Sequence, residues 1–465
     1  MTGTIVANLL VILQSADASK RDWNPIASVL WNILGAVLVL SVIIVIHELG
    51  HFLVAKFFKI KVETFSVGFG PRLIGFRRGE TDYRISAFLL GGYVKMAGET
   101  PSDTITGAEH EFLSKPKWQR FLVASAGPAM NVVLAVGILT GLYVYGTEVP
   151  EFLMGQAVVG AVEPGSPADR AGIKPGDEIA SLDGKERPDW QDVFNVVLTS
   201  PGANLPVVVQ RHGQRVETTL VPERKGPDES GYVGMGPLVR TVVRRVYGAP
   251  ALAAGIQVGD EILKVNGIEL KNSGRYVQET IQKVPEKTFP ITVLRNGREI
   301  ELQVTPEMKN GTRMIGIEIP FPTVMIKLGL VDGLKRSIQV NTDNAALLFQ
   351  LIPKLFRREA SIKQLNGPIG IIQISGQAMD AGMATLITLM AIISLNLGVL
   401  NLLPIPILDG GAMLLLLVES LMGRDLSLRM KERIVQVSFV FLLMLFVIVM
   451  YNDVVKLLPP NQAAP

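Results

Sequence analysis

The feature that most constrains the fold is an uncharged, apolar run from Pro25 to Ile46 that ends directly at His47-Glu48-Leu49-Gly50-His51. A run of this length can cross a bilayer as a helix. Residues four apart share one face of a helix, so both imidazoles can bind a single ion while Glu48 stays free to move a proton. Ionisable groups at membrane depth are costly and usually functional. The segment therefore predicts a membrane helix that carries the ligand pattern of a zinc hydrolase.

The composition favours a membrane protein with soluble insertions, because 48% of the 465 residues are hydrophobic. The net charge is only +3 and the basic residues form no blocks, which argues against a nucleic-acid partner. There is no cysteine, so nitrogen and oxygen atoms must bind any zinc. No basic residue precedes the short apolar run within residues 1–25, so we expect an N-terminal extension that is not cleaved, with signal cleavage as the alternative.

Three more uncharged runs predict three more membrane spans. They are Phe121 to Thr147, Ala381 to Leu408, and Ile434 to Asn452. Pro404 and Pro406 should stop the helix of the third span, and Ala412 to Val418 is expected to form a short helix before the fourth. Lys117 and Trp118 precede the second span and suit the headgroup level of a membrane. Within that span, Asn131 is a polar side chain at membrane depth, and we expect it to make one hydrogen bond to a neighbouring helix.

The segments beside the spans have their own patterns. Residues 59–118 are rich in glycine, and the corner Arg78-Gly79-Glu80 between two extended stretches predicts a hairpin. Residues 323–380 mix basic and apolar positions, which predicts an amphipathic helix near the membrane surface.

An internal repeat occupies the soluble stretch between spans two and three. Ala171-Gly172-Ile173-Lys174-Pro175-Gly176-Asp177-Glu178-Ile179 recurs as Ala254-Gly255-Ile256-Gln257-Val258-Gly259-Asp260-Glu261-Ile262. Each copy ends in a hairpin signal, Arg211-His212-Gly213 in the first and Arg295-Asn296-Gly297 in the second. The two units, residues 156–224 and 230–306, resemble PDZ domains. His212 falls in the turn, so we expect it to be solvated and not a metal ligand.

If both repeats lie on one side of the membrane, spans one and three run in the same direction. His47 and Asp409 then arrive near the same boundary of the membrane. Basic residues flank that boundary, after span one and before span four: Lys56, Lys59, Lys61, Arg72, Arg77, Arg78, Arg424, Arg429, Lys431 and Arg433. By the positive-inside rule, the active site is expected toward the cytoplasm, with the repeats and both termini outside.

A catalytic zinc needs three protein ligands and one open position. His110, in the loop after span one, is one candidate for the third ligand. Asp409 is preferred, because a carboxylate in an irregular segment at membrane depth is rarer and harder to explain otherwise.

The segment Asn401-Leu402-Leu403-Pro404-Ile405-Pro406-Ile407-Leu408-Asp409-Gly410-Gly411, together with the His-Glu motif, strongly resembles the site-2 protease family of intramembrane zinc metalloproteases (peptidase M50). The resemblance implies that His47, His51 and Asp409 bind Zn²⁺ and that Glu48 is the general acid and base. It implies that Asn401 helps to position substrate, and that residues 63–98 form a membrane re-entrant hairpin. Gly127-Pro128-Ala129-Met130-Asn131 is similar to the family's second-span signature. Ala412 departs from the family, which commonly has histidine there.

The same resemblance implies an inner (plasma) membrane protein with periplasmic repeats and termini, and it implies a substrate class. The expected substrate is the transmembrane segment of a single-span protein, an anti-sigma factor already trimmed outside the membrane, with leftover signal peptides as a second class. An extended substrate can add as a strand to an unpaired hairpin edge; we expect residues 72–90 to provide this edge, with contacts from Arg72, Leu73, Ile74 and Gly75. The PDZ-like pair either binds peptide ends or acts as a size filter; the resemblance favours the filter.

The expected fold is therefore a multi-span α-helical membrane protein, with four transmembrane helices and a re-entrant β-hairpin, plus two small α+β PDZ-like domains. After residues 1–25 and besides the two repeats, the expected segments are span one (26–58), hairpin and loop (59–118), span two (119–147), juxtamembrane segment (323–380), span three with its Leu-Asp-Gly motif (381–409), loop with a short helix (410–433) and span four (434–456). The alternative is a membrane-anchored PDZ scaffold without catalysis, in which Glu48 and Asp409 would be dispensable.

Overall fold

The computed structural model describes residues 25–99, 106–226, 228–270, 274–309, 312–319, 322–357 and 361–457. The chain divides into two compact units, a helical unit with one hairpin and a second unit formed mainly by residues 148–326. The predicted N-terminal extension lies outside the described residues, apart from Pro25, the first residue of α2.

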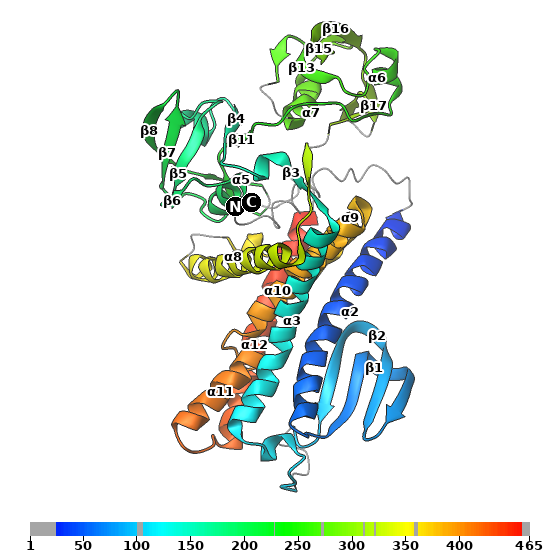
Figure 1. The fold of residues 1–465 in the computed structure, drawn as a ribbon, viewed down its shortest axis with the longest axis vertical. Helices are drawn as coiled ribbons and strands as arrows, with labels where there is room; N and C mark the ends of the chain where they lie inside the picture. The colour runs from blue at the N-terminus through cyan, green and yellow to red at the C-terminus, as the bar shows by residue number, and fades with distance from the viewer. Residues whose placement is uncertain are drawn as a thin grey trace. The chain divides into compact units, whose positions relative to one another are not determined.

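Four helices form the frame of the helical unit (Figure 1). They are α2 (Pro25–Phe57), α3 (Lys117–Tyr145), α10 (Met383–Asn401) and α12 (Leu428–Leu457). Within the described residues, these four are long and apolar enough to cross a membrane. Val39 and Ile43 of α2 are fully buried against Leu386 and Leu389 of α10, so the first and third spans share one core.

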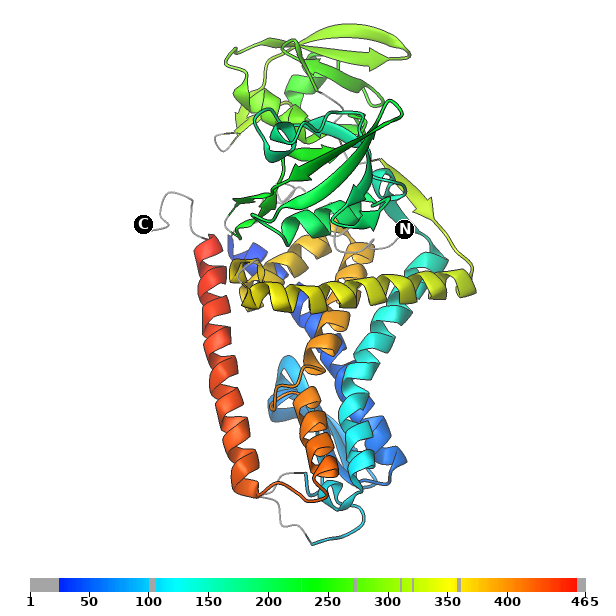
Figure 2. The same cartoon turned by 90° about the vertical axis from the view of Figure 1, so that its left-hand side faces the viewer.

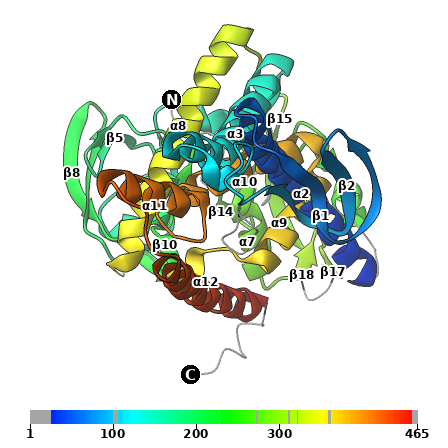
Figure 3. The ribbon, with the colours of Figure 1, turned by 90° about the horizontal axis from the view of Figure 1, so that it is seen from below.

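The hairpin consists of β1 (Val62–Arg78) and β2 (Thr81–Met96), and Figure 3 shows α2 between this hairpin and α3. Each of the two long strands bends so that it contributes two segments to a four-segment sheet. Residues 64–67 pair with 92–95 on one side and with 82–85 on the other, while residues 72–78 pair with 81–86. The sheet therefore has two outer segments, 92–96 and 72–78. Ser41 of α2 donates a hydrogen bond to the carbonyl of Leu89 (2.6 Å), which attaches the sheet to the helix.

The third span, expected over residues 381–409 with the prolines stopping its helix, is divided into two helices. α10 ends at Asn401, a turn containing Pro404 and Pro406 follows, and Asp409 is the first residue of a separate helix, α11 (Asp409–Leu421). Proline lacks an N–H group and cannot continue the helical hydrogen bonds, which is why the chain breaks there. After the turn, α11 continues along the direction of α10 (Figure 2).

The juxtamembrane segment is also more divided than the single amphipathic helix predicted for it. Strand β20 (Thr323–Ile326) precedes α8 (Leu330–Phe356), and α9 (Pro368–Ala381) follows. The amphipathic pattern belongs to α8, whose Ala345 and Leu348 pack toward Leu395 and Val399 of α10 while Leu334 and Ile338 stay exposed.

The second unit contains two copies of one topology. The first sheet has strand order β6-β5-β7-β8 and the second has β14-β13-β15-β16. The strands are β5 (Glu178–Leu182), β6 (Lys185–Glu186), β7 (Leu205–Arg211), β8 (Gln214–Leu220), β13 (Glu261–Val265), β14 (Ile268–Glu269), β15 (Phe289–Arg295) and β16 (Arg298–Val304). Helix α5 (Trp190–Leu198) belongs to the first copy and α7 (Gly274–Lys283) to the second. The repeat seen in the sequence is thus a repeat of structure.

Each copy is tied together by the same buried ion pair. Arg211 donates two hydrogen bonds of 2.7 Å to Asp177, and Arg295 does the same to Asp260. Burial raises the pKa of each aspartate, but the hydrogen bonds from arginine outweigh it and the net pKa is lowered. Each copy therefore depends on a carboxylate that stays ionised.

Candidate active site

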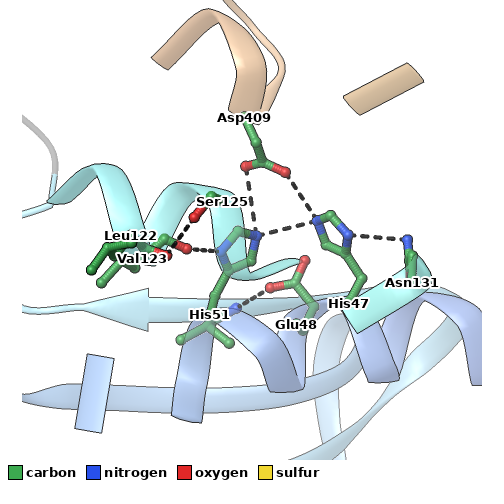
Figure 4. A network of polar contacts seen from close by, with 9 residues as sticks. His47, Glu48, His51, Leu122, Val123, Ser125, Asn131 and Asp409 are labelled. Carbon is green, nitrogen blue, oxygen red and sulfur yellow. Dashed lines mark hydrogen bonds and ion pairs between the residues drawn. The ribbon is translucent and has the colours of Figure 1, made fainter. Parts of the chain in front are cut away.

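Three predicted ligands converge where α11 meets α2 and α3 (Figure 4). His47 Nε2 lies 3.1 Å from Asp409 Oδ2 and 3.2 Å from His51 Nε2, and His51 Nε2 lies 3.6 Å from Asp409 Oδ1. Two ligands of a tetrahedral zinc ion with bonds of about 2.0–2.1 Å are separated by roughly 3.3 Å. The donor atoms and their spacing therefore fit zinc, and these residues could hold the ion.

The two histidines come from adjacent turns of α2, as their spacing predicts. Asp409 reaches them because the turn after α10 packs tightly against the start of α11. A Cβ atom on Gly411 would lie 2.2 Å from the carbonyl oxygen of Ile405, so only glycine allows this approach. The aspartate also occupies the first turn of its helix, where a negative charge is favourable.

Helix α3 contacts the outer nitrogen of both histidines, a role that the sequence analysis did not assign to it. His51 Nδ1 is 2.8 Å from the carbonyl oxygen of Val123, and His47 Nδ1 is 3.2 Å from Nδ2 of Asn131. We predicted one interhelical hydrogen bond for Asn131, and the structure shows that its partner is His47. The signal available in the sequence was the spacing of Val123, Gly127 and Asn131, which places them on one face of α3.

Gly127 lies between those two contacts and makes room for the imidazoles. A Cβ atom at this position would be 2.3 Å from His51 Nε2 and 2.7 Å from His47 Nε2. Any side chain there would crowd the two nitrogen atoms that face Asp409. The second-span signature, residues 127–131, therefore contributes to the site, because its glycine leaves space for the two imidazole rings.

Glu48 points to the hairpin side of α2. The backbone N–H of Val94 donates a hydrogen bond to Glu48 Oε2 (3.0 Å), and a Cβ atom on Gly92 would be 3.6 Å from Glu48 Cγ. Val94 belongs to the outer segment 92–96, so its N–H is free to bond outside the sheet. The hairpin thus fixes the carboxylate beside the two histidines.

The other candidate residues are not part of this three-ligand cluster. Asn401 is the last residue of α10, before the turn that leads to Asp409. His110 and Ala412 are exposed. His212 is exposed in a turn with a φ of +47°, as expected for a solvated loop residue.

Arg72, Leu73, Ile74 and Gly75 lie on the outer segment opposite to Val94. Two intervening segments separate them from residues 92–96, which at strand spacings of about 4.8 Å is roughly 14 Å across the sheet. Leu73 and Ile74 are exposed, at 63% and 71%. The structure does not bring these predicted substrate contacts to Glu48.

A zinc-type ligand set with an adjacent carboxylate, on helices able to cross a membrane, defines a membrane-embedded metal-dependent hydrolase. The chain matches peptidase family M50 over residues 35–445, and it belongs to that family. The protein is accordingly an integral membrane zinc metalloprotease.

Three relatives show how much of the chain this similarity covers. The chain is 30% identical over 453 residues to the regulator of sigma E protease of Haemophilus influenzae, covering 92% of this chain and 100% of that protein. It is 30% identical over 456 residues to the regulator of sigma-E protease RseP of Escherichia coli K12, with the same coverage. A putative zinc metalloprotease of Vibrio cholerae is 29% identical over 461 residues, 92% of this chain and 99% of that protein.

Proposed function

We propose that His47, His51 and Asp409 bind the catalytic zinc and that Glu48 is the general base and acid for cleavage of transmembrane segments. The observation that carries the proposal is the convergence of three donor atoms within 4.8 Å, with Glu48 on the adjacent position of the same helix. Both α2 and α3 are apolar enough to cross a membrane, so the peptide bond to be cleaved lies in or beside the bilayer.

Bound zinc supplies a Lewis acid that polarises the peptide carbonyl and lowers the pKa of a coordinated water. Glu48 accepts a proton from the attacking water and donates it to the leaving amide nitrogen, so no covalent intermediate forms with the protein. The hydrogen bond from Val94 N–H fixes the carboxylate for both proton transfers. Asn401 is proposed to help hold the substrate backbone.

A helical substrate must be unwound locally, because all its carbonyls are bonded internally. We propose that it adds as an extended strand to an edge of the hairpin. In the outer segment beside Glu48, Gly92, Val94 and Met96 are buried and the Val94 N–H is bonded to Glu48. The exposed opposite edge, with Arg72 to Gly75, suits a part of the substrate distant from the bond to be cleaved. Proline removes a backbone donor, so proline at Ile74 should reduce cleavage without loss of zinc; unchanged cleavage would count against this edge.

The relatives named as regulators of sigma-E protease support a substrate of the same kind. We propose a single-span anti-sigma factor, trimmed outside the inner membrane beforehand, with remnant signal peptides as a second class. Basic residues after span one and before span four support an active site toward the cytoplasm, with periplasmic repeats and termini.

The two repeats are proposed to be PDZ-like domains that act as a size filter, with binding of peptide ends as the alternative. Deletion of residues 156–305 should permit cleavage of untrimmed substrate. If untrimmed substrate stays intact while trimmed substrate is still cut, the filter is wrong.

The direct test is incubation of the purified protein with a single-span peptide. Cleavage by the unaltered protein should disappear in Glu48→Gln and on addition of a chelator, and it should return when zinc is restored. A Glu48→Gln or Asp409→Asn variant with normal activity would favour the non-catalytic scaffold.

A further inference from the structure

Asn131 has an unusual environment for a polar side chain in a membrane helix. Its exposed fraction is 0%, and its Nδ2 lies 3.2 Å from His47 Nδ1. Its Oδ1 atom is buried and has no hydrogen-bond partner among the described residues. A buried acceptor without a partner is costly, so this oxygen calls for an explanation.

The tautomer of His47 supplies one. His47 Nε2 faces Asp409, so it must be unprotonated to bind zinc, and the proton of the neutral ring then sits on Nδ1. An N–H at Nδ1 needs an acceptor, and the nearest side chain is the amide of Asn131. The oxygen and nitrogen of an amide have almost the same shape, so rotating the group by about 180° presents Oδ1 to that N–H.

The amide orientation with Nδ2 toward His47 suits the metal-free site, in which the His47 ring carries its proton on Nε2. In this tautomer Nδ1 accepts a hydrogen bond from Asn131 Nδ2, and Nε2–H donates to Asp409 Oδ2 at 3.1 Å. The Asn131 amide can therefore form a hydrogen bond with His47 Nδ1 in both the metal-free and the zinc-bound state, because it carries a donor and an acceptor. A carboxylate could form this bond only in the zinc-bound state, and an apolar side chain could form it in neither state.

His51 shows the same arrangement with a backbone group. Its Nδ1 is 2.8 Å from the carbonyl oxygen of Val123, which can only accept, so the Nδ1 proton is fixed and Nε2 is free for metal. Val123 and Asn131 lie two turns apart on one face of α3. That helix is fixed in turn by α10, because Ser394 Oγ donates to the backbone carbonyl of Asn131 (2.8 Å).

We infer that Asn131 is a positioning residue of the zinc site, whose side-chain oxygen accepts a hydrogen bond from His47 Nδ1–H and sets the tautomer that binds the metal. This inference rests on the proposed zinc site. Outer hydrogen-bond partners of metal-binding histidines orient the ring and raise its basicity, and their loss costs about 10–100-fold in metal affinity.

The experiment measures zinc affinity of the full-length protein in detergent by competition with a chromophoric chelator. Asn131→Leu, which keeps the volume but has no acceptor, should bind zinc about 10–100-fold more weakly. Asn131→Asp, which keeps the acceptor and loses the donor, should bind within a few-fold of the unaltered protein. Thr140→Val is the matched control and should leave zinc affinity unchanged, because it removes another side-chain hydrogen bond of α3, from Thr140 Oγ1 to the carbonyl of Val136, without touching His47 or Asn131.

The outcomes separate the inference from the proposed function. Unchanged affinity in Asn131→Leu, or an Asn131→Asp variant as weak as Asn131→Leu, overturns the role of Asn131. If the leucine variant does not fold, a folded Asn131→Asp protein that fails to bind zinc overturns it instead. Zinc binding that survives His47→Ala and Asp409→Ala would show that the proposed site itself is wrong.

Discussion

Replacement of Gly127 by alanine tests the close packing of α3 against the two histidines. The new Cβ atom would lie 2.3 Å from His51 Nε2 and 2.7 Å from His47 Nε2. Ordinary contacts between heavy atoms begin near 3.5 Å, so the helix or the rings must move by about 1 Å. Zinc sites tolerate ligand displacements of only about 0.2 Å, and a misplacement of about 1 Å near reacting groups can cost 100-fold. We therefore expect loss of zinc and at least a roughly 100-fold fall in kcat/KM, about 3 kcal/mol.

The matched control is Gly137→Ala on the same helix, where an added Cβ atom has nothing within 4 Å. Both changes favour helix formation by roughly 1 kcal/mol, so a difference between the variants reports on the site and not on helix propensity. Zinc content after dialysis against a weak chelator and cleavage of a single-span peptide are the two measurements. A Gly127→Ala protein that retains zinc and cleaves substrate like Gly137→Ala would refute the placement of the two rings beside α3.

Three further outcomes follow from the same contacts. Glu48→Gln should keep zinc but lose about 100- to 10,000-fold in cleavage rate, and a loss of metal would point to a ligand role instead. Asp177→Asn should lower the free energy of unfolding of the first repeat by about 1.5–3 kcal/mol near neutral pH, measured by tryptophan fluorescence. The pKa of Asp177 is lowered in the folded protein, so this stabilisation is present above the unfolded carboxyl pKa of about 3.9 and is lost as the pH falls through the folded value. The stability difference between Asp177→Asn and the unaltered protein should therefore be smaller at pH 3 than at neutral pH. An equal difference at both pH values would contradict a role for the ionised carboxylate. His110→Ala should leave zinc content and cleavage unchanged, because His110 is exposed; reduced zinc content would show that the third ligand was misassigned.

Local patterns predicted much of this protein. The four membrane helices follow from runs that are uncharged over the length of a bilayer. The repeat in the sequence predicted two copies of one unit, and both hairpin turns form as expected, with His212 and Asn296 at positive φ. These predictions succeed because hydrophobic length and turn chemistry act over a few residues.

Boundaries and partners were harder to predict. The prolines were expected to stop the third helix, but α10 already ends at Asn401, and the short helix expected from Ala412 begins at Asp409. The sequence did not indicate which hairpin segment lies beside Glu48; the register folds β1 and β2 so that it is residues 92–96, while substrate contact by Arg72 through Gly75 stays a prediction. Pairing of this kind depends on contacts between strands that local pattern does not specify.

The sequence by itself determined which residues could bind the metal, because few combinations of imidazole and carboxylate occur at membrane depth. Only the tertiary structure decided what surrounds them: the carbonyl of Val123, the missing side chain of Gly127 and the amide of Asn131. The physical reason is that ligand chemistry belongs to side-chain type, which the sequence states directly. The orientation of a ring depends on which backbone and side-chain groups of another helix come within hydrogen-bonding distance, and helix packing alone sets that distance.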